Sequence, residues 1–135
     1  MARWITVYKP EDLEFVRHSP NSDVNSKEFE LWCEECRKKT IFDCDLASES
    51  GTLENWSGPA SEIGLPLLSE IHEKGFHEGI EWRKDKIIRA IEELHKWRQY
   101  MVEKNSMHKQ LEEDYKNFLE GLYIALKVDG LVSII

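Results

Sequence analysis

Long apolar runs are missing from the sequence. No stretch approaches the roughly 18 apolar residues that a bilayer-spanning helix needs. The first residues, Met-Ala-Arg-Trp, lack the basic segment and the following apolar stretch of a secretion signal. Cysteine is also scarce, and an odd count of three argues against a framework of disulfides. We therefore expect a cytoplasmic protein that makes no contact with membranes.

Recognisable catalytic motifs are missing as well. The sequence has no phosphate-binding Gly-x4-Gly-Lys-Ser/Thr loop, no dinucleotide fingerprint and no Gly-x-Ser-x-Gly elbow. Residues 72–77, His-Glu-Lys-Gly-Phe-His, place the second histidine one residue too late for the His-Glu-x2-His helix of metalloproteases. We expect a protein that is not an enzyme. The alternative is a metal-dependent hydrolase whose zinc ion keeps an open coordination position.

Lysine and arginine are absent from residues 40–73, in a chain whose formal net charge is −8. An acidic surface repels phosphates and releases no counterions from them, so direct binding of nucleic acid is not expected. Charge complementarity favours a basic protein surface as the partner. The alternative is that the charge only keeps the protein in solution. The acidic residues of this stretch are Asp43, Asp45, Glu49, Glu54, Glu62, Glu70 and Glu73.

What is present indicates one domain, since 135 residues is an ordinary domain length. Residues 1–46 are rich in β-branched and aromatic side chains or alternate between apolar and polar ones. This pattern predicts a small antiparallel sheet. Residues 13–18 fit either a strand or a short helix. The predicted strands run from Arg3 to Tyr8, from Glu28 to Trp32 and from Thr40 to Leu46.

The second half of the chain is predicted to be helical, from residue 66 to residue 127, after a polar loop at 47–65. Pro66 suits the first turn of a short helix that ends near Gly75. Beyond it, apolar residues at helical spacing predict two longer helices, which should pack as an antiparallel hairpin.

These two helices are expected at about 78–104 and 107–127. The apolar tail at 128–135 is either a last strand or a docked segment. The predicted fold class is therefore α+β, with the N-terminal sheet packed on the C-terminal hairpin.

Cys33-Glu-Glu-Cys36 has the spacing of two thiolates that bind one zinc ion from a tight turn. Because the motif lies between two predicted strands, we expect a zinc knuckle that holds a structural zinc. The alternatives are free core cysteines or a redox pair. Residues 28–46 thus resemble half of a zinc ribbon, without its second Cys-x2-Cys.

Two further ligands are needed, and His72 and His77 match the His-x3–5-His arm of Cys2His2 sites. In one unbroken helix they would point about 140° apart, so the hypothesis requires a break at Gly75. The alternative is a pair of surface histidines. Other candidates are Cys44, which alternates with apolar neighbours as a buried residue would, His18 and His95.

Trp56 and Trp82 are predicted interface anchors. Trp56 stands in a polar segment, and Trp82 lies off the apolar stripe of its predicted helix. The alternative for each is burial in the core. A basic cluster at residues 83–89 next to the acidic region would support self-association, so a helical-hairpin oligomer is a further possibility.

Small size, acidic charge, absent catalytic motifs and a fold supported by Cys33 and Cys36 resemble phage-encoded anti-CRISPR inhibitors. The resemblance implies a stoichiometric inhibitor in the host cytoplasm that occupies a basic surface of a CRISPR effector nuclease. It would make the carboxylates of the acidic stretch the contacts, and these are Asp43, Asp45, Glu49 and Glu54.

Overall fold

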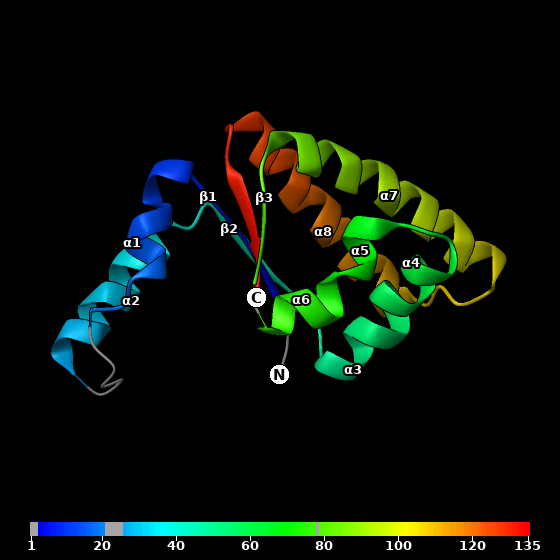
Figure 1. Ribbon diagram of the computed structural model, residues 1–135, viewed down its shortest axis with the longest axis horizontal. Helices are drawn as coiled ribbons and strands as arrows, with labels where there is room; N and C mark the ends of the chain where they lie inside the picture. The colour runs from blue at the N-terminus through cyan, green and yellow to red at the C-terminus, as the bar shows by residue number, and fades with distance from the viewer. Residues whose placement is uncertain (1–2, 21–25, 78) are drawn as a thin grey trace.

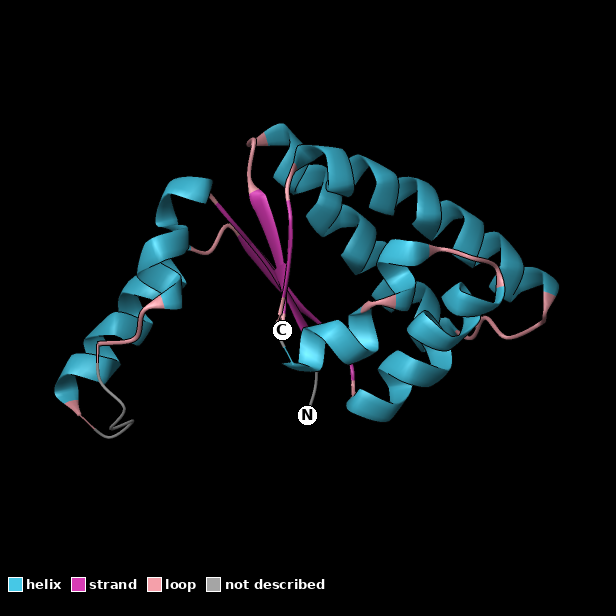
Figure 2. Cartoon of the chain, in the orientation of Figure 1, coloured by secondary structure: helices cyan, strands magenta, loops and turns pink. Residues whose placement is uncertain are grey.

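The protein folds as a four-stranded antiparallel sheet between a large helical layer and a short two-helix arm (Figures 1 and 2). This computed structural model describes residues 3–20, 26–77 and 79–135, without the side chains of residues 75–77. The predictions of an α+β fold, an antiparallel sheet and a C-terminal helical pair are confirmed. Within the described residues, no helix is both long and apolar enough to cross a membrane.

The strand order of the sheet is β2-β1-β4-β3, and each neighbouring pair is antiparallel. The apolar tail forms β4 in the interior of the sheet, which is one of the two outcomes that the sequence left open. Strand β1 lies where it was predicted. The bounds are β1 (Arg3–Tyr8), β2 (Phe42–Ala47), β3 (Ile80–Trp82) and β4 (Leu131–Ile134).

The helical hairpin covers one face of the sheet. It consists of α7 (Lys84–Glu103) and α8 (Lys109–Lys127), joined at Asn105, whose φ of 57° ends the first helix. The predicted start of the first helix near residue 78 is wrong, because residues 80–82 form β3 instead. Glu78 itself lies outside the described residues.

The predicted polar loop at 47–65 is also wrong. This segment contains a series of short helices. The Ser48 hydroxyl caps the first of them by accepting the Gly51 N–H at 3.1 Å. Trp56 is buried at the centre and holds this segment against the hairpin. The elements are α3 (Glu49–Gly51), the π-helical turn η2 (Thr52–Ser57) and α4 (Gly58–Glu62), followed by α5 (Pro66–Ser69) and α6 (Ile71–His77).

The arm contains the largest departure from the sequence-based prediction. Residues 28–32 are not a strand but part of helix α2 (Lys27–Lys39). The Ser26 side chain caps this helix by accepting the Phe29 N–H, and three basic residues end it. The alternation of Phe29 and Leu31 was misleading, since Leu31 is 57% exposed.

The rest of the arm is η1 (Pro10–Asp12) and α1 (Leu13–Arg17), so residues 13–17 adopt the helical alternative. Lys39 Nζ lies 3.3 Å from Asp12 Oδ1 and ties the end of α2 to η1. The Trp32 indole N–H donates to the Phe15 carbonyl at 2.9 Å and joins α2 to α1. No residue of helix α2 is fully buried, and α2 stands outside the main core (Figure 1).

Candidate binding face of the sheet

The two faces of the sheet differ because side chains alternate along each strand. Ile5 and Val7 of β1, together with Val132 and Ile134 of β4, are fully buried in the core. The intervening residues point to the opposite face, which the arm covers in part (Figure 1). The core face is therefore occupied by the fold itself, and the opposite face is left for other contacts.

The strand register places the side chains of this second face in rows across the sheet. The first row, Tyr8 with Leu131, is buried under Leu13 and Val16 of α1. The second row runs from Asp43 through Thr6 and Ser133 to Glu81, and the third from Asp45 through Trp4 to Ile135. In the second row Ser133 is still buried and Arg17 of α1 reaches Glu81, whereas Asp43 at the β2 end of that row is exposed.

Beyond the arm, the second face is open. Trp4 is 49% exposed and Ile135 is 68% exposed, and the two are hydrogen-bonded neighbours on adjacent strands. Asp45, opposite Trp4 on β2, is exposed too, so an indole and a carboxylate stand side by side. We call this surface the open face and define it by Trp4, Thr6, Asp43, Asp45 and Ile135.

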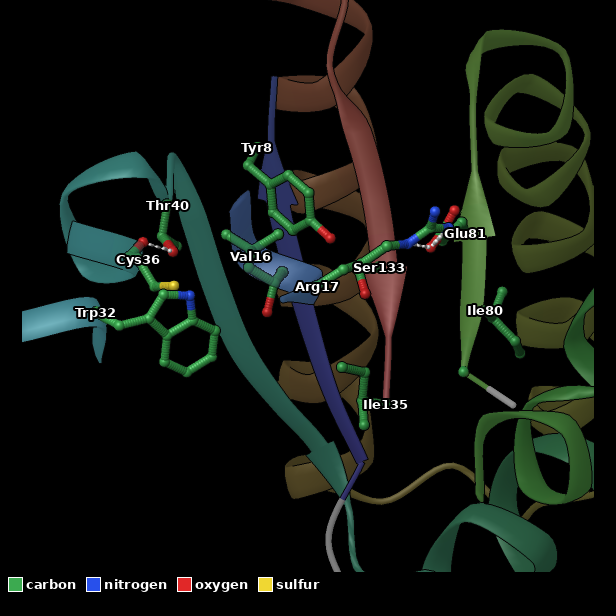
Figure 3. Close-up of a pocket in the computed structure, with 12 residues that line it drawn as sticks. Tyr8, Val16, Arg17, Trp32, Cys36, Thr40, Ile80, Glu81, Ser133 and Ile135 are labelled. Atoms are coloured by element: carbon green, nitrogen blue, oxygen red, sulfur yellow. Dashed lines mark hydrogen bonds and ion pairs between the residues drawn. The ribbon is translucent and has the colours of Figure 1, made fainter. Parts of the chain in front are cut away.

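A pocket of about 440 Å³ lies where the arm meets the open face (Figure 3). Arg17 reaches from α1 across the sheet to Glu81 of β3, with its Nε 2.9 Å from the Glu81 carboxylate. Trp32 and Cys36 of α2 form the arm side of the pocket. The strand side carries hydroxyl groups, and these belong to Thr6, Tyr8 and Ser133.

Two titratable groups of the pocket, the Tyr8 hydroxyl and the Cys36 thiol, have a raised pKa. Burial raises the pKa of Tyr8, against a smaller opposing effect of the Ser133 hydroxyl. Burial also raises the pKa of Cys36, and the nearby Cys33 raises it further. A raised pKa leaves less of the Cys36 thiol as the nucleophilic thiolate.

The structure separates the predicted zinc ligands. Cys33 and Cys36 lie about one turn apart on α2, both partly buried, whereas His72 belongs to α6 on the other side of the sheet (Figure 1). The side chain of His77 lies outside the described residues. Where side chains are described, no group of three or more His, Cys, Asp or Glu residues could hold a metal ion.

The strand–knuckle–strand geometry is therefore wrong, because the Cys-x2-Cys motif sits inside a helix. Zinc binding by the two thiols stays a prediction. Of the substitute ligands, Cys44 packs against the core, where burial first and then Asp43 raise its pKa to about 12. His18 lies 3.1 Å from Glu14 on α1, and His95 lies 3.3 Å from the Tyr115 hydroxyl on the hairpin.

Neither predicted tryptophan anchor is exposed. Trp56 is 0% exposed and stacks on Trp97 with ring centroids 4.1 Å apart. Trp82 is 1% exposed and stacks on Phe118 at 6.1 Å. The core alternative holds for both, and the prediction of interface anchors at these positions is wrong.

Of the predicted acidic contacts, Asp43 and Asp45 lie on the open face. Glu54 is exposed on η2, and Glu49 is partly buried at the start of α3. The sequence-based reading missed Trp4. A signal was present in β1, where Ile5 and Val7 form one face and Trp4, Thr6 and Tyr8 form the other. Because both faces carry large apolar or aromatic side chains, one of the two could have been recognised as a surface for binding.

Comparison of the chain with family models, with curated proteins and with solved structures found no match. The site is therefore interpreted from its own geometry.

Proposed function

We propose that this protein acts by binding a basic surface of another protein through its open face. The observation that carries the proposal is the exposed Trp4 next to Asp45 on a sheet face that the arm leaves uncovered. Tryptophan removes a large apolar area from water at low entropic cost, and tryptophan is enriched among the residues that dominate binding energies. The aspartates add charge that selects a cationic partner.

Electrostatics supports this choice of partner. Asp43 and Asp45 begin the stretch from residue 40 to 73 that has no Lys or Arg. A basic partner surface in many proteins is one that holds nucleic acid, and an acidic protein bound there excludes the nucleic acid. The proposed activity is accordingly stoichiometric inhibition of a nucleic-acid-handling enzyme, such as a CRISPR effector nuclease, without chemistry on a substrate.

The test is binding to a panel of purified effector nucleases, measured by biolayer interferometry at 50 mM and 300 mM salt. We expect at least one member to bind, with affinity that falls as salt rises. The double variant Asp43→Lys/Asp45→Lys should lose at least tenfold in affinity. The matched control, Glu92→Lys/Glu103→Lys, makes the same change in net charge on exposed positions of α7.

The control variant should bind within about threefold of the unchanged protein. Equal losses in the two variants would show that net charge alone governs binding. That result, or no binding to any member of the panel, would overturn the proposal.

A further inference from the structure

The outer edge of β2 is an unpaired strand edge among the described strands, since β1 is the neighbour of β2 and the sheet ends there. Trp4 exchanges both backbone hydrogen bonds with Ile135, at 2.9 and 3.1 Å, so its N–H and C=O point toward β4. Backbone groups of successive strand residues point to alternate sides. The backbone groups of Ile5 consequently point toward β2. Val7, two residues further along β1, has the same direction, and its carbonyl accepts the Ile41 N–H at 2.8 Å.

Cys44 is the register partner of Ile5, so the backbone groups of Cys44 point toward β1. The two residues beside it have the opposite direction. Asp43 and Asp45 therefore direct their N–H and C=O groups to the outer edge, where they can accept a further strand.

Carboxylates flank this edge on both faces of the sheet. Asp43 and Asp45 stand on the open face, and α8 supplies Asp114 and Glu120 on the side of the hairpin. After burial, the influences that raise the pKa of Cys44 come from these four carboxylates. A strand laid along β2 would thus meet negative charge above and below its backbone.

The hairpin supports β2 from the core side and leaves its edge clear. The Phe42 ring packs against Gly121 of α8 so closely that a Cβ added there would lie 2.8 Å from the ring. Among the described elements, β1 and α8 provide the main packing of β2. Asp43 and Asp45 are exposed. The strand is therefore supported by α8 on one face, and two of its residues, Asp43 and Asp45, are exposed.

We propose that an extended basic segment of the partner adds to β2 as a fifth strand. This inference rests on the proposed function and specifies how the partner is held. Backbone hydrogen bonds to Asp43 and Asp45 supply affinity, and Lys or Arg side chains at alternate positions pair with the flanking carboxylates. Strand β2 has six residues, about 20 Å, and accommodates a segment of similar length.

A second copy of this chain is a poor occupant of the edge. Two β2 strands side by side would place the aspartates of one copy against those of the other, and like charges directly opposite are destabilising. At the other end of the sheet, β3 has only three residues, and its Glu81 is already paired with Arg17. The charge pattern thus selects a foreign, cationic strand at β2.

The probe is a fluorescein-labelled, N-acetylated peptide amide of eight residues in which Lys alternates with Val, measured by fluorescence anisotropy at 50 mM salt. Two N-methylated versions, each blocking every second amide, test the backbone. Only one set of amides can face β2. We expect one methylated peptide to lose at least tenfold in affinity and the other to bind within about threefold of the parent.

The variant Asp45→Pro tests the edge from the protein side, because it removes a flanking carboxylate together with an outward backbone N–H. It removes an N–H that points to the outer edge and leaves the ladder to β1 intact, and proline is tolerated on edge strands. We expect at least a tenfold loss for the parent peptide. The methylated peptides need no protein variant, so the test stands even if Asp45→Pro fails to fold.

Two results would overturn the strand addition. One is failure of the parent peptide to bind at all. The other is equal affinity for both methylated peptides. If Asp43→Lys/Asp45→Lys still abolishes binding to the nuclease panel in that case, the open face binds through side chains alone and the proposed function survives. If Asp43→Lys/Asp45→Lys binds the nuclease panel as well as the control Glu92→Lys/Glu103→Lys does, the proposed function itself is overturned.

Discussion

At the scale of single residues, the tryptophans divide the molecule into a core and a surface. Trp56 is sandwiched in the core, with Trp97 stacked at 4.1 Å and Phe118 edge-on at 5.6 Å. The Trp97 indole N–H donates to the Asn55 carbonyl at 2.8 Å, so the stack also fixes the backbone of η2. Trp4, in contrast to Trp56, has about half of its surface exposed to solvent.

The variant Trp56→Ala should therefore lower the free energy of unfolding by about 3–5 kcal/mol, because truncating a buried tryptophan removes its packing and leaves a cavity. Urea denaturation followed by far-UV circular dichroism measures the change. Trp4→Ala serves as the control and should cost less than about 1 kcal/mol. Similar costs for the two variants would contradict the division into buried and exposed tryptophans.

Residue patterns in the sequence could predict some of these positions and not others. The exposed aspartates of β2 could be named from the sequence because their charge is visible without a fold, and their role as contacts stays a prediction. The burial of Trp56 was not decided by the sequence, since its neighbours are polar and its partner Trp97 is 41 positions away. Trp4 was missed because the exposure of either face of β1 depends on where the helices pack.

At the scale of elements, strong periodicity was a good guide and short windows were not. The hairpin helices and β1 carry long or unambiguous patterns, and the sequence predicted all three, although α7 begins at Lys84 rather than near residue 78. Helix α2 was misread because two apolar residues alternated over a five-residue window. Its better signals were the Ser26 cap and apolar residues at 29, 32, 33 and 36, which have helical spacing.

The cap of α2 gives a prediction specific to the arm. Ser26→Ala removes the acceptor of the Phe29 N–H, which lies 3.1 Å from the Ser26 hydroxyl. Loss of such a cap costs about 1 kcal/mol of helix stability. We expect amide hydrogen exchange to speed up severalfold across residues 27–39. The exchange of β1 amides should stay unchanged, because α2 buries no side chain in the core.

Unchanged exchange in α2 would show that the cap does not hold the helix. Acceleration in β1 as well would show that the arm and the sheet unfold as one unit.

At the scale of the whole molecule, the core lies between the hairpin and one face of the sheet, and the cysteines of the Cys-x2-Cys motif stand outside it. Any zinc ion bound by Cys33 and Cys36 would therefore stabilise the arm rather than the body. This differs from the architecture predicted from sequence, in which zinc joined the two halves of the chain. Sequence spacing alone could not distinguish a knuckle from a helix.

We accordingly predict that a chelator leaves the main thermal transition unchanged. Differential scanning calorimetry with and without excess EDTA should give Tm values within about 1 °C. The same should hold for Cys33→Ser/Cys36→Ser, which removes both thiols. A fall of 5 °C or more on chelation, which corresponds to about 1 kcal/mol or more in a domain of this size, would contradict the structure-based view.

The position of β4 between β1 and β3 has a consequence for the growing chain on the ribosome. Strands β1 and β2 are complete once residue 47 has been made, but the central strand between β1 and β3 requires residues 131–134. At translation rates of about 5–20 residues per second, that interval lasts roughly 4–17 s. During this interval the edge of β1 that will pair with β4 has no strand beside it. The nascent protein therefore needs other contacts to keep this edge from pairing with another chain.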